Sequence, residues 1–203
     1  MKQQIWFTSD THFAHKNICR GVSEWKDGDR TRDFSCLESM NYRIVKQINN
    51  HVQQDDILYH LGDWSFNGVE NIWNFRKQII CKNVHLILGN HDQHIKKNNW
   101  SFEHVGFPQD NFLSVQGYLE LEIGKQTFVL SHYPMEEWLE MDRRGGIMLH
   151  GHCHHAIDES ETNSIYRRMD VGMDWREFRP FSLEEILDKM KNRPLKKHNA
   201  LIK

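Results

Sequence analysis

The sequence predicts a layered α/β or α+β fold, because short apolar runs alternate along the chain with longer amphipathic stretches. The first strand-like runs occupy residues 5–7, 56–63 and 83–90. Residues 37–52 carry apolar side chains at helical spacing, Met40, Ile44 and Ile48 among them, which predicts a helix with one buried face. Residues 69–80 predict a second helix between two of the strands.

The second half of the chain continues this pattern. Residues 112–131 alternate apolar and polar side chains around Gly124-Lys125, which predicts a β-hairpin. Residues 146–151 predict one more strand. Residues 182–192 predict a closing helix, because Ser182 and Glu185 have the spacing of a capping box.

The bulk composition favours one soluble globular domain, residues 1–203, with a basic tail from about residue 193. Hydrophobic residues make up 38% and charged residues 27%, and no repeat or linker interrupts the 203 residues. The formal net charge of −2 gives no general attraction to nucleic acid or to acidic membranes. No apolar run approaches the roughly 18 residues of a membrane span. We expect a cytoplasmic protein whose four cysteines, none in a CxxC pair, are reduced thiols.

Five apolar runs end in residues that can bind a metal ion. In chain order the endings are Ser9-Asp10-Thr11-His12, Gly62-Asp63, Gly89-Asn90-His91-Asp92, Ser131-His132 and Gly151-His152-Cys153-His154. Ligands of open α/β sheets bind beyond the carboxyl ends of the strands, so these residues are expected to meet at one rim. The glycines suit turns in which the backbone passes close to a bound group.

The residue types at these endings favour two metal ions over one. The candidate ligands combine carboxylate, amide and imidazole groups, and they are Asp10, His12, Asp63, Asn90, His132, His152 and His154. Nitrogen and oxygen donors of this kind suit divalent transition ions. We expect two Mn²⁺ ions, with Fe²⁺, Co²⁺, Ni²⁺ or Zn²⁺ as alternatives. Seven ligands are too many for one catalytic ion, but a shared carboxylate would make two sites with open positions.

The motifs SDTH, GDW, GNHD, SHYP and GHCHH, in this order, resemble those of the calcineurin-like metallophosphoesterases. The resemblance runs from residue 5 to about residue 155 and on toward the end of the chain, where MDVGMDW and RPFSLEEI look like the closing strand and helix of the family. The stretch WFTSDTHFAHKNICR is similar to a small single-domain subgroup from phages and bacteria. It implies a four-layer α/β/β/α sandwich with a dimetal site at the strand ends.

The same resemblance assigns the ligands. It implies that one metal ion is held by Asp10, His12, Asp63 and His154. The other ion would be held by Asp63, Asn90, His132 and His152, with Asp63 bridging. His91 would act on the scissile ester as general acid or electrostatic stabiliser, and Asp92 would orient His91.

Two further expectations concern residues around these motifs. His15, Asn17 and Arg20 could line the phosphate side of the site, although a solvated helix face explains them equally well. In HGHCHH, the strand period of two would place His150, His152 and His154 on one side and Cys153 on the other.

The expected reaction is hydrolysis of a small phosphate mono- or diester, including nucleotides or cyclic nucleotides, by a hydroxide held between the two metal ions. A nuclease acting on DNA or RNA is the nearest alternative, and the near-neutral charge counts against it because a nuclease needs a basic groove. A non-catalytic scaffold of the same fold would be expected to lack some ligands or His91. No membrane partner is expected.

Overall fold

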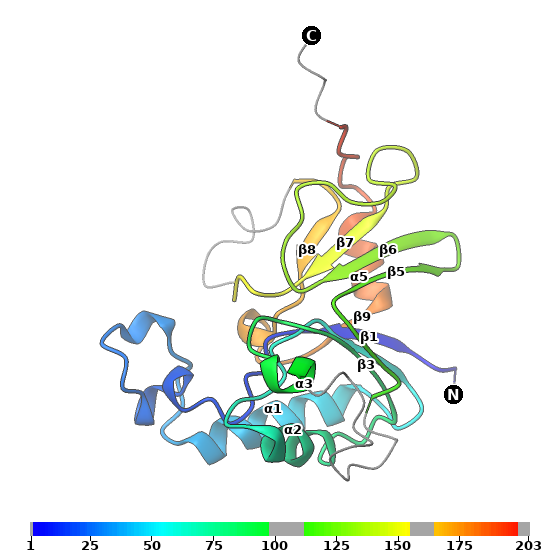
Figure 1. Cartoon of the computed structure of the whole chain (residues 1–203). Coiled ribbons are helices and arrows are strands. Elements are labelled where there is room, and N and C mark those ends of the chain that lie inside the picture. The colour runs from blue at the N-terminus through cyan, green and yellow to red at the C-terminus, as the bar shows by residue number, and fades with distance from the viewer. Residues whose placement is uncertain (1, 98–111, 155–164, 199–203) are drawn as a thin grey trace.

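The computed structural model describes residues 2–97, 112–154 and 165–198, which form two β-sheets with helices (Figure 1). The first sheet has the strand order β4-β3-β2-β1-β9 and the second the order β5-β6-β7-β8. The strands of the first sheet are β1 (Ile5–Thr8), β2 (Ile57–His60), β3 (Asn83–Ile87), β4 (Ser114–Gln116) and β9 (Phe181–Ser182). Those of the second are β5 (Tyr118–Ile123), β6 (Gln126–Ser131), β7 (Ile147–His150) and β8 (Arg168–Asp170). The predicted mixed α/β class is confirmed.

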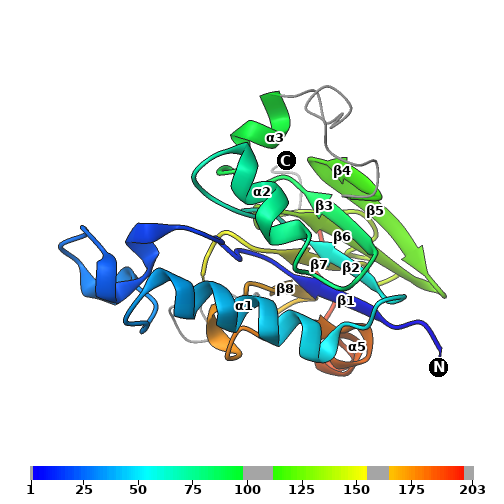
Figure 2. The ribbon, with the colours of Figure 1, turned by 90° about the horizontal axis from the view of Figure 1, so that it is seen from below.

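Helices cover the outer face of the first sheet. The α-helices in the described ranges are α1 (Leu37–His51), α2 (Val69–Arg76), α3 (Gln93–Lys97) and α5 (Leu183–Met190). Met40, Ile44 and Ile48 of α1 are fully buried in one core with Phe75 of α2 and Leu58 of β2. Figures 1 and 2 show α1 and α2 on the side of the first sheet that faces away from the second sheet.

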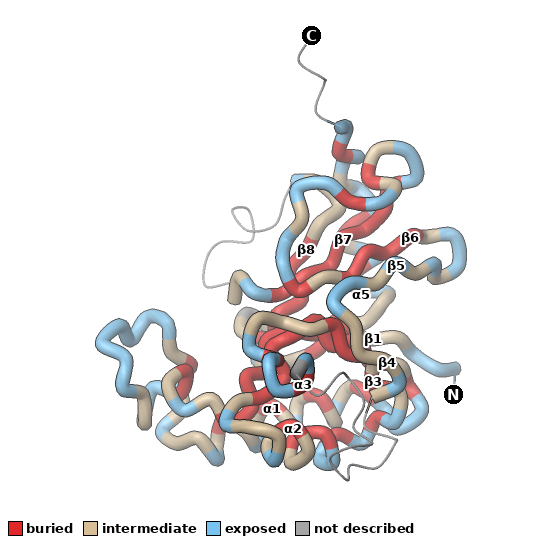
Figure 3. The backbone as a smooth tube through the Cα atoms, in the orientation of Figure 1, coloured by how far each residue is buried: buried red, intermediate tan, exposed pale blue. Residues whose placement is uncertain are grey.

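A second core fills the space between the two sheets. Phe7 of β1 stacks on Phe128 of β6 with ring centroids 5.9 Å apart, and both rings are fully buried. Ile186 and Met190 of α5 belong to the same core, so α5 closes the edge of the sandwich beside β9. Figure 3 shows the resulting red band of buried strand residues through both sheets.

The outer face of the second sheet is covered by turns. Trp138 and Met141 pack against Val129 and Met148, and the indole of Trp138 donates a hydrogen bond to the carbonyl of Gly146. Residues 133–146 contain turns and bends but no helix. Among the residues that the structure describes, the fourth layer of the expected sandwich, which covers the second sheet, is therefore made of turns.

The predicted elements differ from the observed ones in detail. β5 and β6 form the expected hairpin at Gly124, where φ is +65°, but residues 114–116 pair with β3 in the other sheet. The capping box is present, since Ser182 Oγ accepts from the Glu185 nitrogen and the Glu185 carboxylate accepts from the Ser182 nitrogen. Lys196, in the predicted tail, is buried against Glu136 and Trp138.

The strand directions bring the five motif endings to one rim. β1, β2 and β3 are mutually parallel, and so are β6, β7 and β8. An isolated bridge joins Ser9, just beyond β1, to Gly172, just beyond β8, so the two sheets meet at their carboxyl ends. The functional site lies where this junction forms.

Candidate metal centre

His132 is held with a lone pair facing two oxygen acceptors. Its Nδ1 donates a hydrogen bond of 2.8 Å to the carbonyl of Leu61, which leaves Nε2 unprotonated in the neutral ring. That Nε2 lies 2.9 Å from Asn90 Oδ1 and 3.6 Å from Asp63 Oδ2. Three acceptor atoms that face one another repel unless a cation lies among them, so this geometry fits a metal ion.

His154 is held in the same way on the other side of the rim. Its Nδ1 donates a hydrogen bond of 2.9 Å to Asp174 Oδ2, so in the neutral ring, the form that binds metal, Nε2 carries the lone pair. Nε2 lies 2.9 Å from His12 Nε2 and 3.6 Å from Asp10 Oδ1. Asp10 Oδ1 is buried and has no hydrogen-bond donor among the described residues. A buried carboxylate oxygen without a donor is costly, and a bound cation would remove that cost.

Asp63 lies between these two groups of donors. Its Oδ2 is 3.6 Å from His12 Nε2 and also 3.6 Å from His132 Nε2. Its Oδ1 accepts a 2.9 Å hydrogen bond from the backbone nitrogen of His91. The equal distances fit a carboxylate shared by two metal ions, as the motif resemblance implies.

His152 reaches the same cluster from the turn after β7. Its ring Nδ1 lies 3.0 Å from Asn90 Oδ1, and its backbone nitrogen donates to Asp10 Oδ2 at 2.9 Å. Three sets of donor atoms among the described residues lie within 4.8 Å of one another. Two belong to this cluster, Asp10-His12-His154 and Asp10-Asp63-His132, and the third is His150-Cys153-Asp170. The structure thus brings together the seven predicted ligands, which are Asp10, His12, Asp63, Asn90, His132, His152 and His154.

Burial and mutual charge shift the pKa values of the cluster. Burial lowers the pKa of His12 to about 3 and raises that of Asp63 to about 7. Burial alone would raise the pKa of Asp10, but the neighbouring histidines hold it below the usual range. Burial alone would lower the pKa of His154, but its hydrogen bond to Asp174 carries it to about 8. Such opposed shifts in one cluster are typical of functional sites.

Most of the cluster stands on left-handed backbone. Positive φ angles occur at five of the predicted ligands, namely Asp10 (56°), His12 (47°), Asp63 (58°), His152 (70°) and His154 (55°). Non-glycine residues rarely adopt this conformation, and strain of this kind concentrates at functional sites. Because β7 ends at His150, the expected strand alternation through His152 and His154 is wrong.

Glycines let the ligand loops approach closely. A Cβ at Gly62 would lie 2.5 Å from His132 Nδ1, and one at Gly151 would lie 1.9 Å from Ser9 Oγ and 2.3 Å from Asp10 Oδ2. Gly62 also has φ of +100°. The close approach expected from the sequence is therefore found at these turns.

Asp92 holds the loops rather than the ring of His91. Its Oδ2 accepts from the backbone nitrogens of Asp63 at 2.9 Å and Gly89 at 2.8 Å, and its Oδ1 accepts from that of Trp64 at 2.9 Å. With both oxygens engaged by backbone N–H groups, the expected role in orienting His91 is replaced by a structural one. The signal that could have shown this is the Gly89–Asp92 spacing, which is that of a side chain closing a turn.

His91 lies at the surface of the cluster. Its ring centroid is 5.6 Å from that of His12 and 4.7 Å from that of Phe66. Partial burial, followed by the charges of neighbouring histidines, lowers its pKa. The negative charge of a bound phosphate would favour the protonated ring, which is the form a general acid requires.

The three residues expected on the phosphate side have different places. The His15 ring lies 3.7 Å from that of Phe66 and 5.5 Å from that of His12, so it borders the cluster. Arg20 pairs with Asp33 and lines a cavity beside His154. Asn17 instead stabilises its own loop, since its Oδ1 accepts from the Glu24 nitrogen.

Two further residues of the site, Arg32 and Asp174, were given no role in the sequence analysis, although Asp174 lies in the stretch MDVGMDW. Arg32 is buried and donates to both oxygens of Asp174, at 2.6 and 3.1 Å. It also donates to the backbone carbonyls of Asp10 and Thr11. Asp174 in turn fixes the tautomer of His154. Such carboxylate–histidine pairs orient metal ligands in other proteins.

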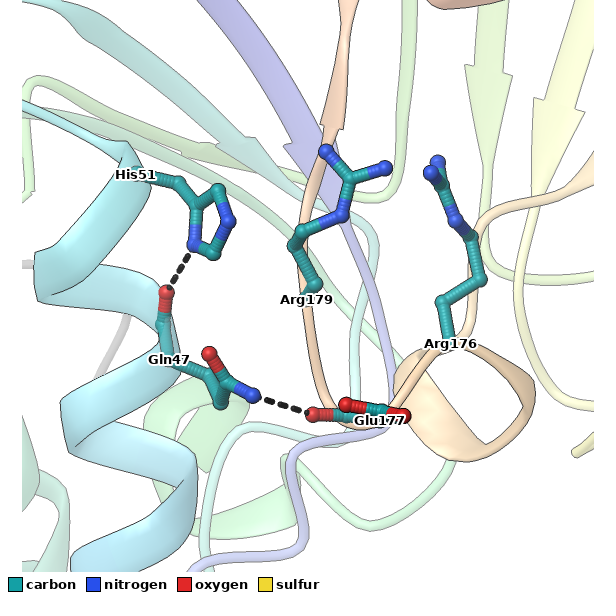
Figure 4. A pocket seen from close by; sticks show the side chains of 5 residues that line it. All are labelled: Gln47, His51, Arg176, Glu177 and Arg179. Carbon is teal, nitrogen blue, oxygen red and sulfur yellow. Dashed lines mark hydrogen bonds between the residues drawn. The ribbon is translucent and has the colours of Figure 1, made fainter.

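Another cavity, of about 560 Å³, is lined by Gln47, His51, Arg176, Glu177 and Arg179 (Figure 4). Arg176 and Arg179 both donate to Glu185, and Glu177 pairs with Arg43. Its charged groups therefore already have partners within the protein.

Comparison with known proteins agrees with this site. Residues 4–169 match a family model described as the calcineurin-like phosphoesterase superfamily domain. The chain therefore belongs to the calcineurin-like phosphoesterase superfamily, and the resemblance read from the motifs is confirmed. Membership implies a phosphoester hydrolase that acts on phosphate-ester substrates, and the clusters described above are compatible with metal binding.

The similar proteins carry no named activity. The chain is 29% identical over 191 residues to the uncharacterized protein MJ1445 of Methanocaldococcus jannaschii, covering 91% of this chain and 90% of that protein. It is 25% identical over 194 residues to the Gene 66 protein of Mycobacterium phage D29, covering 87% and 91%. The crystal structure of a protein of unknown function, AQ665 from Aquifex aeolicus, has a similar fold, with a TM-score of 0.62 at 21% identity. That match covers 93% of this chain and all of the other.

Proposed function

We propose that this protein hydrolyses a small phosphate mono- or diester at a centre of two divalent metal ions, with Mn²⁺ as the expected metal. The observation that carries the proposal is the position of Asp63 Oδ2, which lies 3.6 Å from Nε2 of His12 on one side and 3.6 Å from Nε2 of His132 on the other. Two bound cations would supply a nucleophilic hydroxide at neutral pH and neutralise charge on the phosphoryl oxygens.

The protein's own residues would divide the remaining tasks. Asp63 holds both halves of the centre, and Asp174 and Leu61 keep His154 and His132 in the tautomer that binds metal. His91, fixed by its backbone bond to Asp63, would donate a proton to the leaving oxygen.

The first test is a metal panel with p-nitrophenyl phosphate and bis-p-nitrophenyl phosphate on the chelator-treated protein. We expect hydrolysis to return with Mn²⁺, or with Fe²⁺, Co²⁺, Ni²⁺ or Zn²⁺ if one of these is the native ion. No hydrolysis of either ester with any of these ions would support the alternative of a non-catalytic scaffold. Cleavage of single-stranded oligonucleotides at rates above those of the small esters would support the nuclease alternative.

Two variants separate metal binding from proton transfer. His91→Ala should keep two ions per chain, because His91 is not a proposed ligand, and should lose about 10²- to 10⁴-fold in kcat. Asp63→Ala should lower the metal content itself. Full turnover in metal-loaded His91→Ala, or two ions in Asp63→Ala, would contradict these roles.

A further inference from the structure

A cavity of about 660 Å³ opens beside the metal centre, between residues 18–34 and the segment 174–178. We name it the aromatic cavity. Its lining includes Ile18, Trp25, Phe34, Phe178, Arg20 and Arg30. Figure 1 shows the segment 16–34 as the blue projection beside the body of the protein, and Figure 3 shows most of its outer surface exposed.

The aromatic cavity adjoins the metal centre at His154. His154 lines it, and the same ring presents Nε2 to His12 at 2.9 Å. The buried Arg32–Asp174 pair also lines it, which gives this end of the cavity a rigid polar wall. On the other side, the ring of Trp25 lies 5.5 Å from that of His15, which borders the cluster. A molecule with its phosphate at the metal ions could therefore place its other end here.

The lining suits a flat ring with polar edges. Trp25 is 43% exposed although it is a large apolar side chain, and Phe34 and Phe178 pack 5.3 Å apart behind the opening. Exposed aromatic rings of this kind provide stacking surfaces for bases. Arg20 and Asp33 add hydrogen-bond donors and acceptors at the same opening. Arg20 and Asp33 already pair with each other at 3.0 Å, and a heteroaromatic base, unlike an alkyl group, has polar edges that can bond to the donors and acceptors they have left.

The size of the cavity points to a small molecule. Sites for small ligands measure about 300–1,000 Å³, and this cavity falls within that range. We propose that the aromatic cavity binds the base of a mononucleotide-sized phosphate ester, with Trp25 stacking on the base and the phosphate at the metal centre. The placement of the phosphate rests on the proposed function, and the binding of the base does not.

The test compares ligands that differ only in the base. Adenosine 5′-monophosphate and uridine 5′-monophosphate are titrated by calorimetry into the Mn²⁺-loaded protein, with ribose 5-phosphate as the ligand without a base. We expect at least one nucleotide to bind about tenfold more tightly than ribose 5-phosphate. Trp25→Ala should abolish this preference and Trp25→Phe should retain most of it. Tyr42→Ala is the matched control, because Tyr42 is a 65% exposed aromatic residue of α1 that does not line the cavity.

Equal binding of all three ligands to the unmodified protein would overturn the proposal, and so would an unchanged preference in Trp25→Ala. Hydrolysis of bis-p-nitrophenyl phosphate by the same preparation keeps the two proposals apart. Base preference without hydrolysis with any metal would leave the aromatic cavity standing and refute the hydrolase. Hydrolysis without base preference would support the hydrolase and refute binding of a base in the aromatic cavity.

Discussion

The substitution Gly89→Ala adds one methyl group beside the proposed bridging carboxylate, and the geometry determines what this methyl group must displace. A Cβ at residue 89 would lie 2.1 Å from Asp63 Oδ1 and 2.6 Å from the Asp63 backbone nitrogen. Carbon atoms make ordinary contacts at about 3.5 Å or more, so the carboxylate or its loop must move by more than roughly 1 Å.

A movement of this size disrupts both functions of Asp63. Its Oδ2 lies 3.6 Å from two histidine nitrogens, and its Oδ1 accepts the 2.9 Å bond that fixes His91. Misplacement by about 1 Å costs about 10²-fold in rate. We therefore expect Gly89→Ala to lose about 100-fold in kcat/KM and to retain fewer than two Mn²⁺ ions per chain.

The assay pairs this variant with Gly117→Ala, the same chemical change at a glycine whose added Cβ would meet nothing within 4 Å. Both proteins are dialysed with Mn²⁺, analysed for metal content, assayed with bis-p-nitrophenyl phosphate and unfolded thermally. The thermal scan shows whether lost activity reflects lost folding. The reasoning is refuted if folded Gly89→Ala keeps two ions and the activity of Gly117→Ala.

Three more predictions follow from contacts around the centre. Asp174→Asn no longer fixes the tautomer of His154 and should weaken binding of one Mn²⁺ by about 10- to 100-fold in a metal titration; two unchanged sites would contradict this. Burial lowers the pKa of His60 to about 3. Between about pH 6.5 and pH 3, His60 is therefore protonated in the unfolded state but not in the folded state. As the pH falls through this range, the free energy of unfolding decreases by up to about 1.4 kcal/mol per pH unit. His60→Gln, whose side chain can still donate to Thr11, should remove the contribution of His60 to this pH dependence. The free energy of unfolding is measured with urea at pH 4.5–6.5, and the same pH dependence in His60→Gln and the unmodified protein would contradict the prediction. Residue 152 has a φ of 70°, which glycine adopts without strain and alanine does not. The metal-free His152→Gly protein should therefore be about 1 kcal/mol more stable than His152→Ala, and the opposite order would show that residue 152 is not strained.

The cluster of proposed ligands could be predicted from the sequence because the signals of its residues are local. Each follows an apolar strand, and parallel strands place their ends at one rim whatever the order of the strands. Asn90 and His132 meet at 2.9 Å for this reason, although 42 residues separate them. The residue type at a strand end was therefore sufficient to predict that these side chains converge.

Residues that act through long-range contacts could not be found in this way. Arg32 and Asp174 are separated by 142 positions, and neither was among the predicted site residues. Their importance comes from burial and from a pairing that only the folded chain creates. The aromatic cavity has the same origin, because its walls come from residues 18–34 and 174–178, which no sequence pattern connects.

The left-handed backbone at five of the proposed ligands lowers the stability of the metal-free fold. Left-handed backbone costs a non-glycine residue about 1–2 kcal/mol, so five such ligands cost on the order of 5–10 kcal/mol. That cost is similar to the net stability of a whole domain. Glycine would relieve this cost at each position but would remove the side chain that is proposed to bind metal. The cores above and below the first sheet therefore stabilise a rim that is unfavourable without its ions, and metal binding should contribute strongly to the stability of the native protein.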